Sequence, residues 1–596
     1  MRRRILISRR LTAAEDAAVR TLQQDGWAVQ PFSAAFYSGA RPREEPDAET
    51  KRRINYQVME EILCLGDLDA GGQAFADLFR SGQASLWHYH KFRIYFAVRN
   101  LCYDLEQAGP DEKEDLIWYA GGEWRPVKAL FPGVDFRFEV QAEEKLNLFT
   151  LLQYLTTVSI RLLWSLIPAR GHSDYLVYFA EKDSTILDPE TLRPVKGHHI
   201  LEYLINRLDG RFALLTEVIV PKLKGRSDFS FGRRSLLPRR GARRKEMAEA
   251  FLVRGWLSRK LKREWRLAAQ VLKEGYLRAG KTPMNLHQQM ALEVLKSLDK
   301  TSVYYLFRYL AARRFFGRRK LKAVAASDEN SPLTRSVLDG ARSCGIRIIG
   351  LQHGSIHDLH PAYRYTEGDR ACGIMPDLTL VWGERWKRFL LEKGHYPEDS
   401  VRVTGQLRTD VIPGLLRHMP KKNVPPVVVF ASQPQRDPQL RRRAARDVFS
   451  AVSAIPGCRL IVRLHPREFG DAAYYRAIAE EVGCSDYTTD LHSDLYQLIA
   501  SCDVLITCFS TVGTETVYFE KPLIVLDHLK QDIQGYVREG VAFQASDAGE
   551  LQRLLAGVLD GSLRIDRERY RAFIENYACR IDGQTAGRVI AAITSV

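Results

Sequence analysis

The sequence lacks the cysteine spacing of a zinc site or a disulfide framework. Its nine cysteines are scattered along 596 residues, and no two of them form a CxxC pair. Zinc sites and disulfide-rich folds both depend on cysteines in characteristic spacings. The sequence therefore predicts a protein of a reducing compartment without a structural metal.

Long apolar runs are also scarce. Met1-Arg-Arg-Arg begins like a signal peptide, but only Ile5-Leu-Ile follows, which is too short for secretion. The most apolar stretch, Leu146 to Ile167, is long enough to cross a bilayer. Because Arg161 near its middle makes a span costly, we expect a buried helix or one at a membrane surface.

Acidic residues are outnumbered, and the formal net charge is +16. Most of the excess lies in residues 222–266, which hold 16 basic and four acidic residues, and a second basic run extends from Arg308 to Lys320. Such a run can also be an ordinary solvent-exposed face that has no binding function. Trp256 and Trp265 among the arginines favour an anionic membrane surface instead. Since no zinc finger or RNP signature is present, we expect no nucleic-acid partner.

Strands and helices alternate from Leu321 onward, which is typical of a parallel sheet. A chain of this length is too long to fold around a single hydrophobic core, so we expect two large α/β domains. Residues 322–326 and 346–351 read as strands, and they end in Ser327-Asp-Glu-Asn and Gln352-His353-Gly354. Ligand groups of parallel sheets collect at such carboxyl ends. Residues 418–426 look like a linker to the second domain.

Residues 501–527 form a strand, loop, helix and strand in that order. Ser510 and Thr511 stand where the helix should begin, and Lys521-Pro522 ends it. Free backbone N–H groups at a helix start make a natural phosphate site. An ordinary helix N-cap is the alternative reading of the same hydroxyl residues.

Four short motifs carry a resemblance to known enzymes. Leu351-Gln-His-Gly, Arg463-Leu-His-Pro and Ile506-Thr-Cys-Phe-Ser-Thr before Lys521-Pro522 resemble the CDP-glycerol glycerophosphotransferases, in which Asp and Tyr stand where this chain has Cys508 and Phe509. The CMP-sugar transferases of capsule synthesis are similar. Val403-Thr-Gly resembles the non-hydrolysing sugar-nucleotide 2-epimerases, which look more distant. The resemblance begins near Leu321 and covers under half of the chain.

The resemblance implies a GT-B-like α/β fold of two Rossmann-like domains with a cleft between them. We expect an acceptor-side domain over residues 1–415, with a basic helical insertion at about 146–320, and a nucleotide-binding domain over residues 424–596. The two should meet near residues 415–426 as separate sheets, and the C-terminal helix should pack back toward the first domain.

The implied function is transfer of a sugar from a nucleotide-sugar donor to a lipid-linked or growing cell-surface polysaccharide. Transfer of a polyol phosphate from a CDP donor is one alternative, and a non-catalytic membrane- or glycan-binding scaffold is another. The enzyme would work in the cytoplasm, peripherally on the inner face of the cytoplasmic membrane. No metal and no cofactor are implied.

Each candidate residue has an expected role. His353 is the candidate general base, since a histidine titrates near neutral pH, and Asp328 or Glu329 is the alternative base. The donor phosphate and ribose would be held by six residues: Arg463, His465, Ser510, Thr511, Glu515 and Arg408. The competing reading for each is structural, such as a turn for His465 or a solvated helix residue for Glu515.

Overall fold

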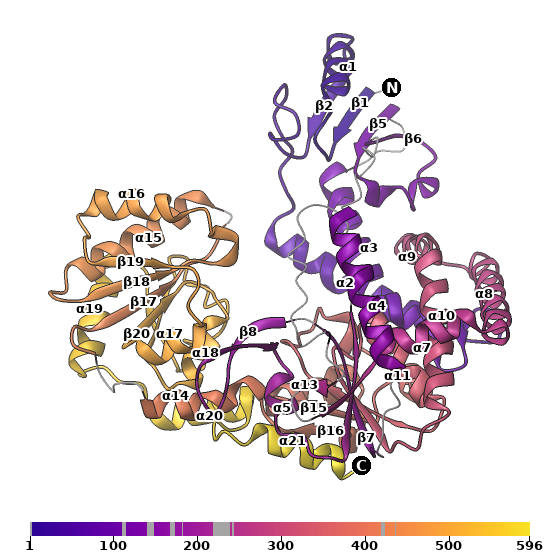
Figure 1. Ribbon diagram of the computed structural model, residues 1–596. Coiled ribbons are helices and arrows are strands. Elements are labelled where there is room, and N and C mark those ends of the chain that lie inside the picture. Colours follow the sequence, from indigo (N-terminus) through magenta and orange to yellow (C-terminus); the bar gives the residue numbers. More distant parts are fainter. Residues whose placement is uncertain are drawn as a thin grey trace.

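The computed structural model describes the chain except residues 1–2, 110–114, 140–147, 167–172, 182, 219–235, 237–238, 241–242, 419–422 and 436. The basic residues between 222 and 235 therefore lie outside the described part. Three mainly parallel sheets of four, eight and six strands organise the fold. In Figure 1 the six-stranded sheet forms a lobe at the left, the four-stranded sheet stands at the top, and the eight-stranded sheet lies in the larger body below it.

The four-stranded sheet is built from the N-terminal residues. Its order is β2-β1-β5-β6, and every neighbouring pair is parallel. The strands are β1 (Arg3–Ile7), β2 (Ala28–Pro31), β5 (Asp115–Ala120) and β6 (Val134–Phe138). Between β1 and β2, helix α1 (Ala13–Gln24) starts at a capping box of Thr12 and Glu15.

A layer of helices joins this sheet to the eight-stranded sheet. Its members are α2 (Ala48–Asp67), α3 (Leu86–Ala108), α7 (Ala248–Leu257), α8 (Arg259–Ala279), α9 (Leu286–Ser297) and α10 (Asp299–Phe316). One apolar core runs from Leu6 of β1 through Trp87 and Leu306 of these helices to Ile348 of the large sheet. The N-terminal sheet is thus attached through a shared core and not through a free linker.

The eight-stranded sheet is parallel except for a short edge strand. In spatial order its strands are β11 (Arg239–Arg240), β12 (Arg243–Met247), β10 (Phe212–Glu217), β7 (Tyr175–Ala180), β13 (Ala323–Ser327), β14 (Arg347–Leu351), β15 (Leu378–Val381) and β16 (Val401–Val403). The chain starts at β7, builds to one side and then returns to build the other side. The order therefore reverses between β7 and β13, the kind of point where open α/β sheets bind ligands.

The six-stranded sheet repeats this plan at the C-terminal end. Its order is β19-β18-β17-β20-β21-β22 and all pairs are parallel. The strands are β17 (Val427–Ala431), β18 (Arg459–Arg463), β19 (Tyr487–Asp490), β20 (Val504–Thr507), β21 (Leu523–Leu526) and β22 (Phe543–Ala545). The order reverses between β17 and β20, which is the dinucleotide-binding arrangement of strands.

The last two helices, α20 (Arg567–Ala578) and α21 (Thr585–Thr594), return to the eight-stranded sheet. The Tyr175 hydroxyl donates to the Thr594 carbonyl at 3.1 Å, and the Trp386 indole donates to the Tyr577 carbonyl at 2.9 Å. The C-terminal helix therefore packs back on the first domain, as expected.

The GT-B-like α/β fold class is confirmed, because two separate parallel sheets lie on either side of residue 420. The finer organisation of the first 415 residues differs from the expectation in two ways. Residues 3–138 form a sheet of their own. The range 146–320, expected as a basic helical insertion, also supplies β7, β10, β11 and β12, so it forms half of the large sheet. Pairing between β7 and β13 joins segments about 150 residues apart, which local sequence patterns do not report.

Candidate active site

A cavity of about 250 Å³ lies at the carboxyl ends of β14, β15 and β16 of the eight-stranded sheet. His353, just after β14, lines it together with Trp382, just after β15. Gln406 and Arg408 line it from the segment that follows β16. Arg408 also reaches the C-terminal sheet, since its guanidinium lies 3.8 Å from Glu515 on α18 (Val512–Tyr518). Arg408 therefore connects the edge of this cavity to the helix that follows β20 of the C-terminal sheet.

His353 and Asp328 form a loose pair at this edge. The Nε2 atom of His353 lies 3.7 Å from Oδ1 of Asp328, and Asp328 follows β13 at the point where the strand order reverses. Asp328 has a φ of 57°, in the left-handed region that few residues other than glycine adopt. Such outliers gather at functional sites. Partial burial raises the pKa of Asp328, and the neighbouring His353 opposes the rise.

Glu329, the other alternative base, lies beneath the site. Its side chain is only 2% exposed, and neither carboxyl oxygen has a hydrogen-bond partner among the described residues. Gly350 of β14 leaves room for it, because a Cβ there would lie 2.9 Å from the Glu329 carboxyl carbon. Burial raises the pKa of Glu329 to about 8. The geometry therefore favours Asp328 over Glu329 as a partner of His353.

Replacing Glu329 by glutamine is expected to change how stability depends on pH. The native carboxyl keeps its proton up to about pH 8, whereas the unfolded one loses it near 4.5. The free energy of unfolding of the wild type should therefore fall as pH rises through this window, and Glu329→Gln should gain about 4 kcal/mol relative to wild type between pH 5 and pH 8. Denaturant titrations at both pH values measure this gain. A difference that stays constant with pH would show that the native carboxyl is ionised.

Arg408 is the cation best placed between the two sheets. It lies in the 3₁₀ turn η6 (Leu407–Val411), and its guanidinium stacks 4.1 Å from the centroid of the Tyr496 ring. Its two carboxylate neighbours, Asp494 at 3.7 Å and Glu515 at 3.8 Å, are beyond good hydrogen-bond distance. Stacking fixes the guanidinium plane while its donors keep room for another anion. Burial raises the pKa of Glu515 to about 7, against the effect of Arg408.

The remaining donor-side candidates follow the central strands of the C-terminal sheet. Ser510, after β20, accepts a hydrogen bond from the amide of Val512, the first residue of α18, at 3.3 Å. Thr511 is the N-cap of this helix, and its exposed side chain makes no capping hydrogen bond. The loop after β17 reaches the same place, because Gln433 accepts from the Phe509 amide at 2.7 Å. These loops flank the point where the strand order reverses.

Arg463 and His465 follow β18, one strand further out. Arg463 pairs with Asp490 at 2.5 Å, so this cation already has a partner. The Nδ1 atom of His465 accepts from the Arg467 amide at 3.1 Å and caps the turn that contains Pro466. His465 therefore has the structural role expected for it as part of a turn. Its Nε2 atom can still donate a hydrogen bond.

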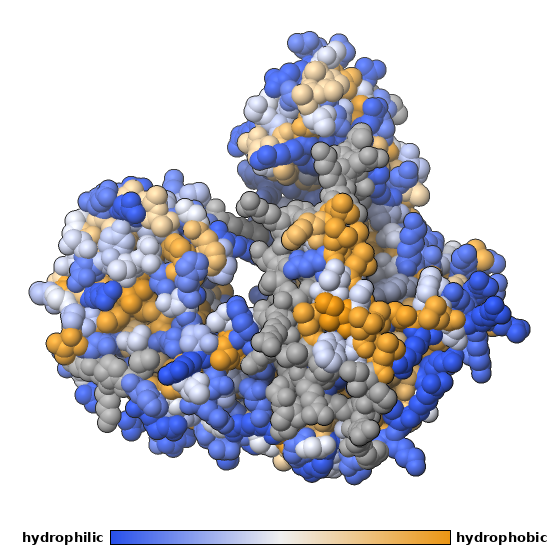
Figure 2. Space-filling model, in the orientation of Figure 1, coloured by the Kyte–Doolittle hydropathy of each residue, from blue (hydrophilic) through white to orange (hydrophobic). Residues whose placement is uncertain are grey.

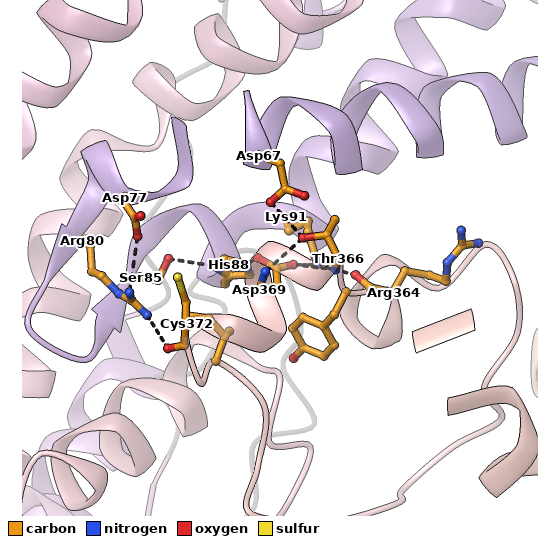
Figure 3. A network of polar contacts seen from close by, with 12 residues as sticks. Asp67, Asp77, Arg80, Ser85, His88, Lys91, Arg364, Thr366, Asp369 and Cys372 are labelled. Carbon is orange, nitrogen blue, oxygen red and sulfur yellow. Dashed lines mark hydrogen bonds and ion pairs between the residues drawn. The ribbon is translucent and has the colours of Figure 1, made fainter. Parts of the chain in front are cut away.

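A buried polar network holds the segment that follows His353 (Figure 3). Ser85, His88 and Lys91, from α3 and its N-cap, face Asp369 of α12 (Glu367–Ala371), and His88 Nε2 lies 2.6 Å from the Asp369 carboxylate. Lys91 donates to the Arg364 carbonyl at 2.6 Å. Burial would raise the pKa of Asp369, but His88 and Lys91 outweigh it and lower that pKa.

The Ser85–His88–Asp369 chain has the composition of a hydrolase triad, with Ser85 Oγ 2.7 Å from His88 Nδ1. Ser85 is only 2% exposed, so a substrate cannot reach its hydroxyl. The network therefore positions residues 364–372 against α3, and through them the loop after His353.

Two histidines near His353 were not among the sequence candidates. His357 and His360 lie on the same loop with ring centroids 5.7 Å apart. Burial, with the charges of His357 and His353, lowers the pKa of His360 to about 4. The spacing of the three histidines was a signal available in the sequence. The sequence gave no signal for the buried partners of Asp369, because they are 278 or more residues away from it.

No protein-family model and no curated protein matches the sequence. Solved structures similar in fold include the UDP-GlcNAc 2-epimerase of Neisseria meningitidis bound to UDP-GlcNAc (TM-score 0.43, 11% identity, 71% of this chain and 100% of that chain). A second is the UDP-GlcNAc 2-epimerase of Methanocaldococcus jannaschii (0.41, 10%, 71% and 99%). A third is a variant of the wall teichoic acid polymerase TagF with CDPG (0.36, 11%, 75% and 97%).

Proposed function

We propose that this protein transfers a sugar from a nucleotide-sugar donor to a lipid-linked or growing cell-surface polysaccharide. The observation that carries the proposal is the cavity where His353 of one sheet edge and Arg408, beside Glu515 of the other, come together. Each sheet reverses its strand order once, between β7 and β13 and between β17 and β20, so each offers a ligand crevice. One crevice for each substrate would suit a reaction between two substrates.

The donor would lie on the C-terminal sheet. The amides and hydroxyls after β20, at Ser510 and Thr511, would hold phosphate oxygens, and the free donors of Arg408 would neutralise the charge that develops on the leaving phosphate. His465 and Arg463 would contribute from the next strand. Glu515 can accept a hydrogen bond from a ribose hydroxyl, since it lies one helical turn beyond Ser510 and Thr511.

The acceptor would lie on the eight-stranded sheet beside His353. As the acceptor oxygen forms a bond to the anomeric carbon, the bond from that carbon to the donor phosphate breaks and the phosphate takes the electron pair. The acceptor proton moves to the His353 imidazole, and the Asp328 carboxylate stabilises the imidazolium that forms. Each group then acts on a different substrate.

The acceptor defines where the protein would work. A lipid-linked acceptor is presented at a bilayer, so the proposal places the protein peripherally on the inner, anionic face of the cytoplasmic membrane. The described part of the chain has no helix with both the length and the apolar character needed for crossing a bilayer.

Donor hydrolysis across UDP-, GDP- and CMP-sugars and CDP-linked polyols tests the proposed reaction. We expect slow release of nucleotide from one class of sugar donor, because transferases of this plan hold an activated donor beside water when no acceptor is present. Release from CDP-polyols alone would replace sugar transfer by polyol-phosphate transfer. Neither release nor binding of any donor would overturn the proposal in favour of a scaffold.

A further inference from the structure

Helix α4 (Leu148–Ser165) is amphipathic in the opposite sense to a core helix. Its buried positions are polar, namely Thr150, Thr157 and Arg161. Its exposed positions include large apolar side chains: Phe149 is 77% exposed, Leu152 54%, Leu155 49% and Leu163 65%. A surface helix normally turns its apolar stripe inward, so this orientation requires an explanation.

The polar face of α4 is held inward by specific contacts. The Arg161 guanidinium is fully buried, lies 3.0 Å from Glu249 of α7, and donates to the Thr216 carbonyl at 3.0 Å. A buried cation with such partners cannot be turned toward solvent without leaving its carboxylate unpaired. The outward apolar face is therefore built into the fold.

The apolar face continues onto the neighbouring helices. Helix α4 packs against α7, where Val253, Trp256 and Leu257 are exposed, and α7 packs against α10, where Tyr304 is exposed. Trp256 borders an apolar hollow of about 540 Å³ with Trp265 and Phe307. Figure 2 shows apolar surface along α4 that extends toward α7 and α10.

Basic side chains flank this apolar face. Arg259, Lys260, Arg263 and Arg266 of α8 are exposed, and so are Arg314 and Arg318 at the end of α10. The Lys262 ammonium lies 4.9 Å from the centroid of the Trp256 ring, so charge and aromatic surface are in direct contact. Figure 2 shows hydrophilic surface beside the apolar band on the side of α8.

We propose that the exposed face of α4 and α7 docks into an anionic phospholipid bilayer, with the apolar side chains among the acyl chains and the basic residues of α8 at the headgroups. Apolar side chains with tryptophan next to a cationic row match the depth profile of such a surface. A second copy of the chain is a less suitable partner for this face. A two-fold contact would bring the basic residues of α8 in one copy close to the same residues in the other copy, and like charges repel.

This inference takes from the proposed function only the expectation that the protein works at a membrane. It adds that docking is an insertion of apolar side chains and not only attraction between charges. The basic stretch expected to bind the membrane is partly outside the described residues, whereas α4 and α7 are described in full.

Vesicle co-sedimentation of the full chain tests the docking face. The double variant Leu152→Gln with Leu155→Gln should bind vesicles of phosphatidylcholine and phosphatidylglycerol at least about tenfold more weakly than wild type, because it removes inserted apolar area. Both side chains are about half exposed, so the fold should survive, which thermal unfolding checks. The control is Leu416→Gln with Leu529→Gln, two leucines of similar exposure elsewhere, and it should bind like wild type.

The salt dependence of vesicle binding and the depth of the tryptophan side chains in the bilayer distinguish insertion from electrostatic attraction alone. Raised salt should weaken wild-type binding but leave a remaining affinity that the α4 variant lacks, because buried apolar area is not screened. Lipids brominated on the acyl chain should quench tryptophan fluorescence, and Trp256→Phe should reduce the quenching. Equal vesicle binding by wild type and the α4 variant would overturn the proposal. So would a wild-type dimer that the same variant converts to monomer without change in vesicle binding.

Measuring donor hydrolysis on the same samples distinguishes a failure of membrane docking from a failure of the proposed reaction. Donor hydrolysis in solution should be the same for wild type and the α4 variant, since α4 lies outside the cavity lining. Loss of vesicle binding with donor hydrolysis absent in both proteins would support docking and count against the transferase. Intact hydrolysis with unchanged vesicle binding would count against docking alone.

Discussion

His353→Ala is expected to lower turnover at least about a hundredfold while donor affinity stays near that of wild type. In the proposed reaction the imidazole takes the acceptor proton, and that interaction matters in the transition state. Its contact with Asp328 at 3.7 Å and its place in the cavity lining put it at the edge of the eight-stranded sheet, where the acceptor is proposed to lie. Steady-state rates with saturating donor measure the loss.

The matched control is His395→Ala. His395 is also paired with a carboxylate, Glu367 at 2.9 Å, but it lies outside the cavity lining. Its removal should leave turnover unchanged. Asp328→Asn should give a smaller loss than His353→Ala, because it removes the charge that stabilises the imidazolium and keeps the base. Full turnover by His353→Ala would make His353 structural and leave Asp328 as the base.

Arg408→Gln is expected to weaken binding of the nucleotide donor about ten- to a hundredfold, the usual value of a hydrogen bond to a charged group. The guanidinium stacks on Tyr496 at 4.1 Å and has only loose carboxylate partners, so a phosphate can take its donors. Turnover at saturating donor should fall as well, since the proposed reaction uses the same cation to stabilise the leaving phosphate. Calorimetric titration with the nucleotide measures the affinity.

Arg385→Gln controls for the loss of a contact between the two lobes. Arg385 of α13 (Glu384–Gly394) also stacks on an aromatic ring, that of Tyr577 at 4.9 Å, and has a loose partner in Glu539 at 3.9 Å. It lies outside the cavity, so this variant should bind nucleotide like wild type. Equal weakening by both variants would show that Arg408 only holds the lobes together.

The sequence predicted the local elements of the second half closely. Residues 346–351 and 523–526 read as strands and are β14 and β21, because apolar runs bounded by glycine, proline or polar residues leave little choice. The aromatic-rich stretch 85–105 fits strand and helix alike, and it is α3. Its buried face contacts several elements, so no single period stands out.

The positions of His353 and Asp328 in one region followed from the rule that carboxyl ends of parallel strands meet at an edge. Arg408 was expected to bind the donor, and its place beside them did not follow from that rule. The burial of Glu329 did not follow, because it depends on the missing side chain of Gly350 on the neighbouring strand. The outward apolar face of α4 depends on Glu249 and Thr216, which lie 88 and 55 residues from Arg161. Contacts of this range are set by tertiary structure and are not visible in local periodicity.

In the proposed reaction the two sheet edges act on different substrates, so acceptor activation should be separable from donor binding. Isothermal titration with the nucleotide alone, beside turnover on the same preparations, can detect this separation in wild type, His353→Ala and Arg408→Gln. We expect unchanged affinity with lost turnover for His353→Ala, and weakened affinity for Arg408→Gln. Nucleotide affinity that is the same in all three proteins, or equally reduced in both variants, would show that the two tasks are not divided in this way.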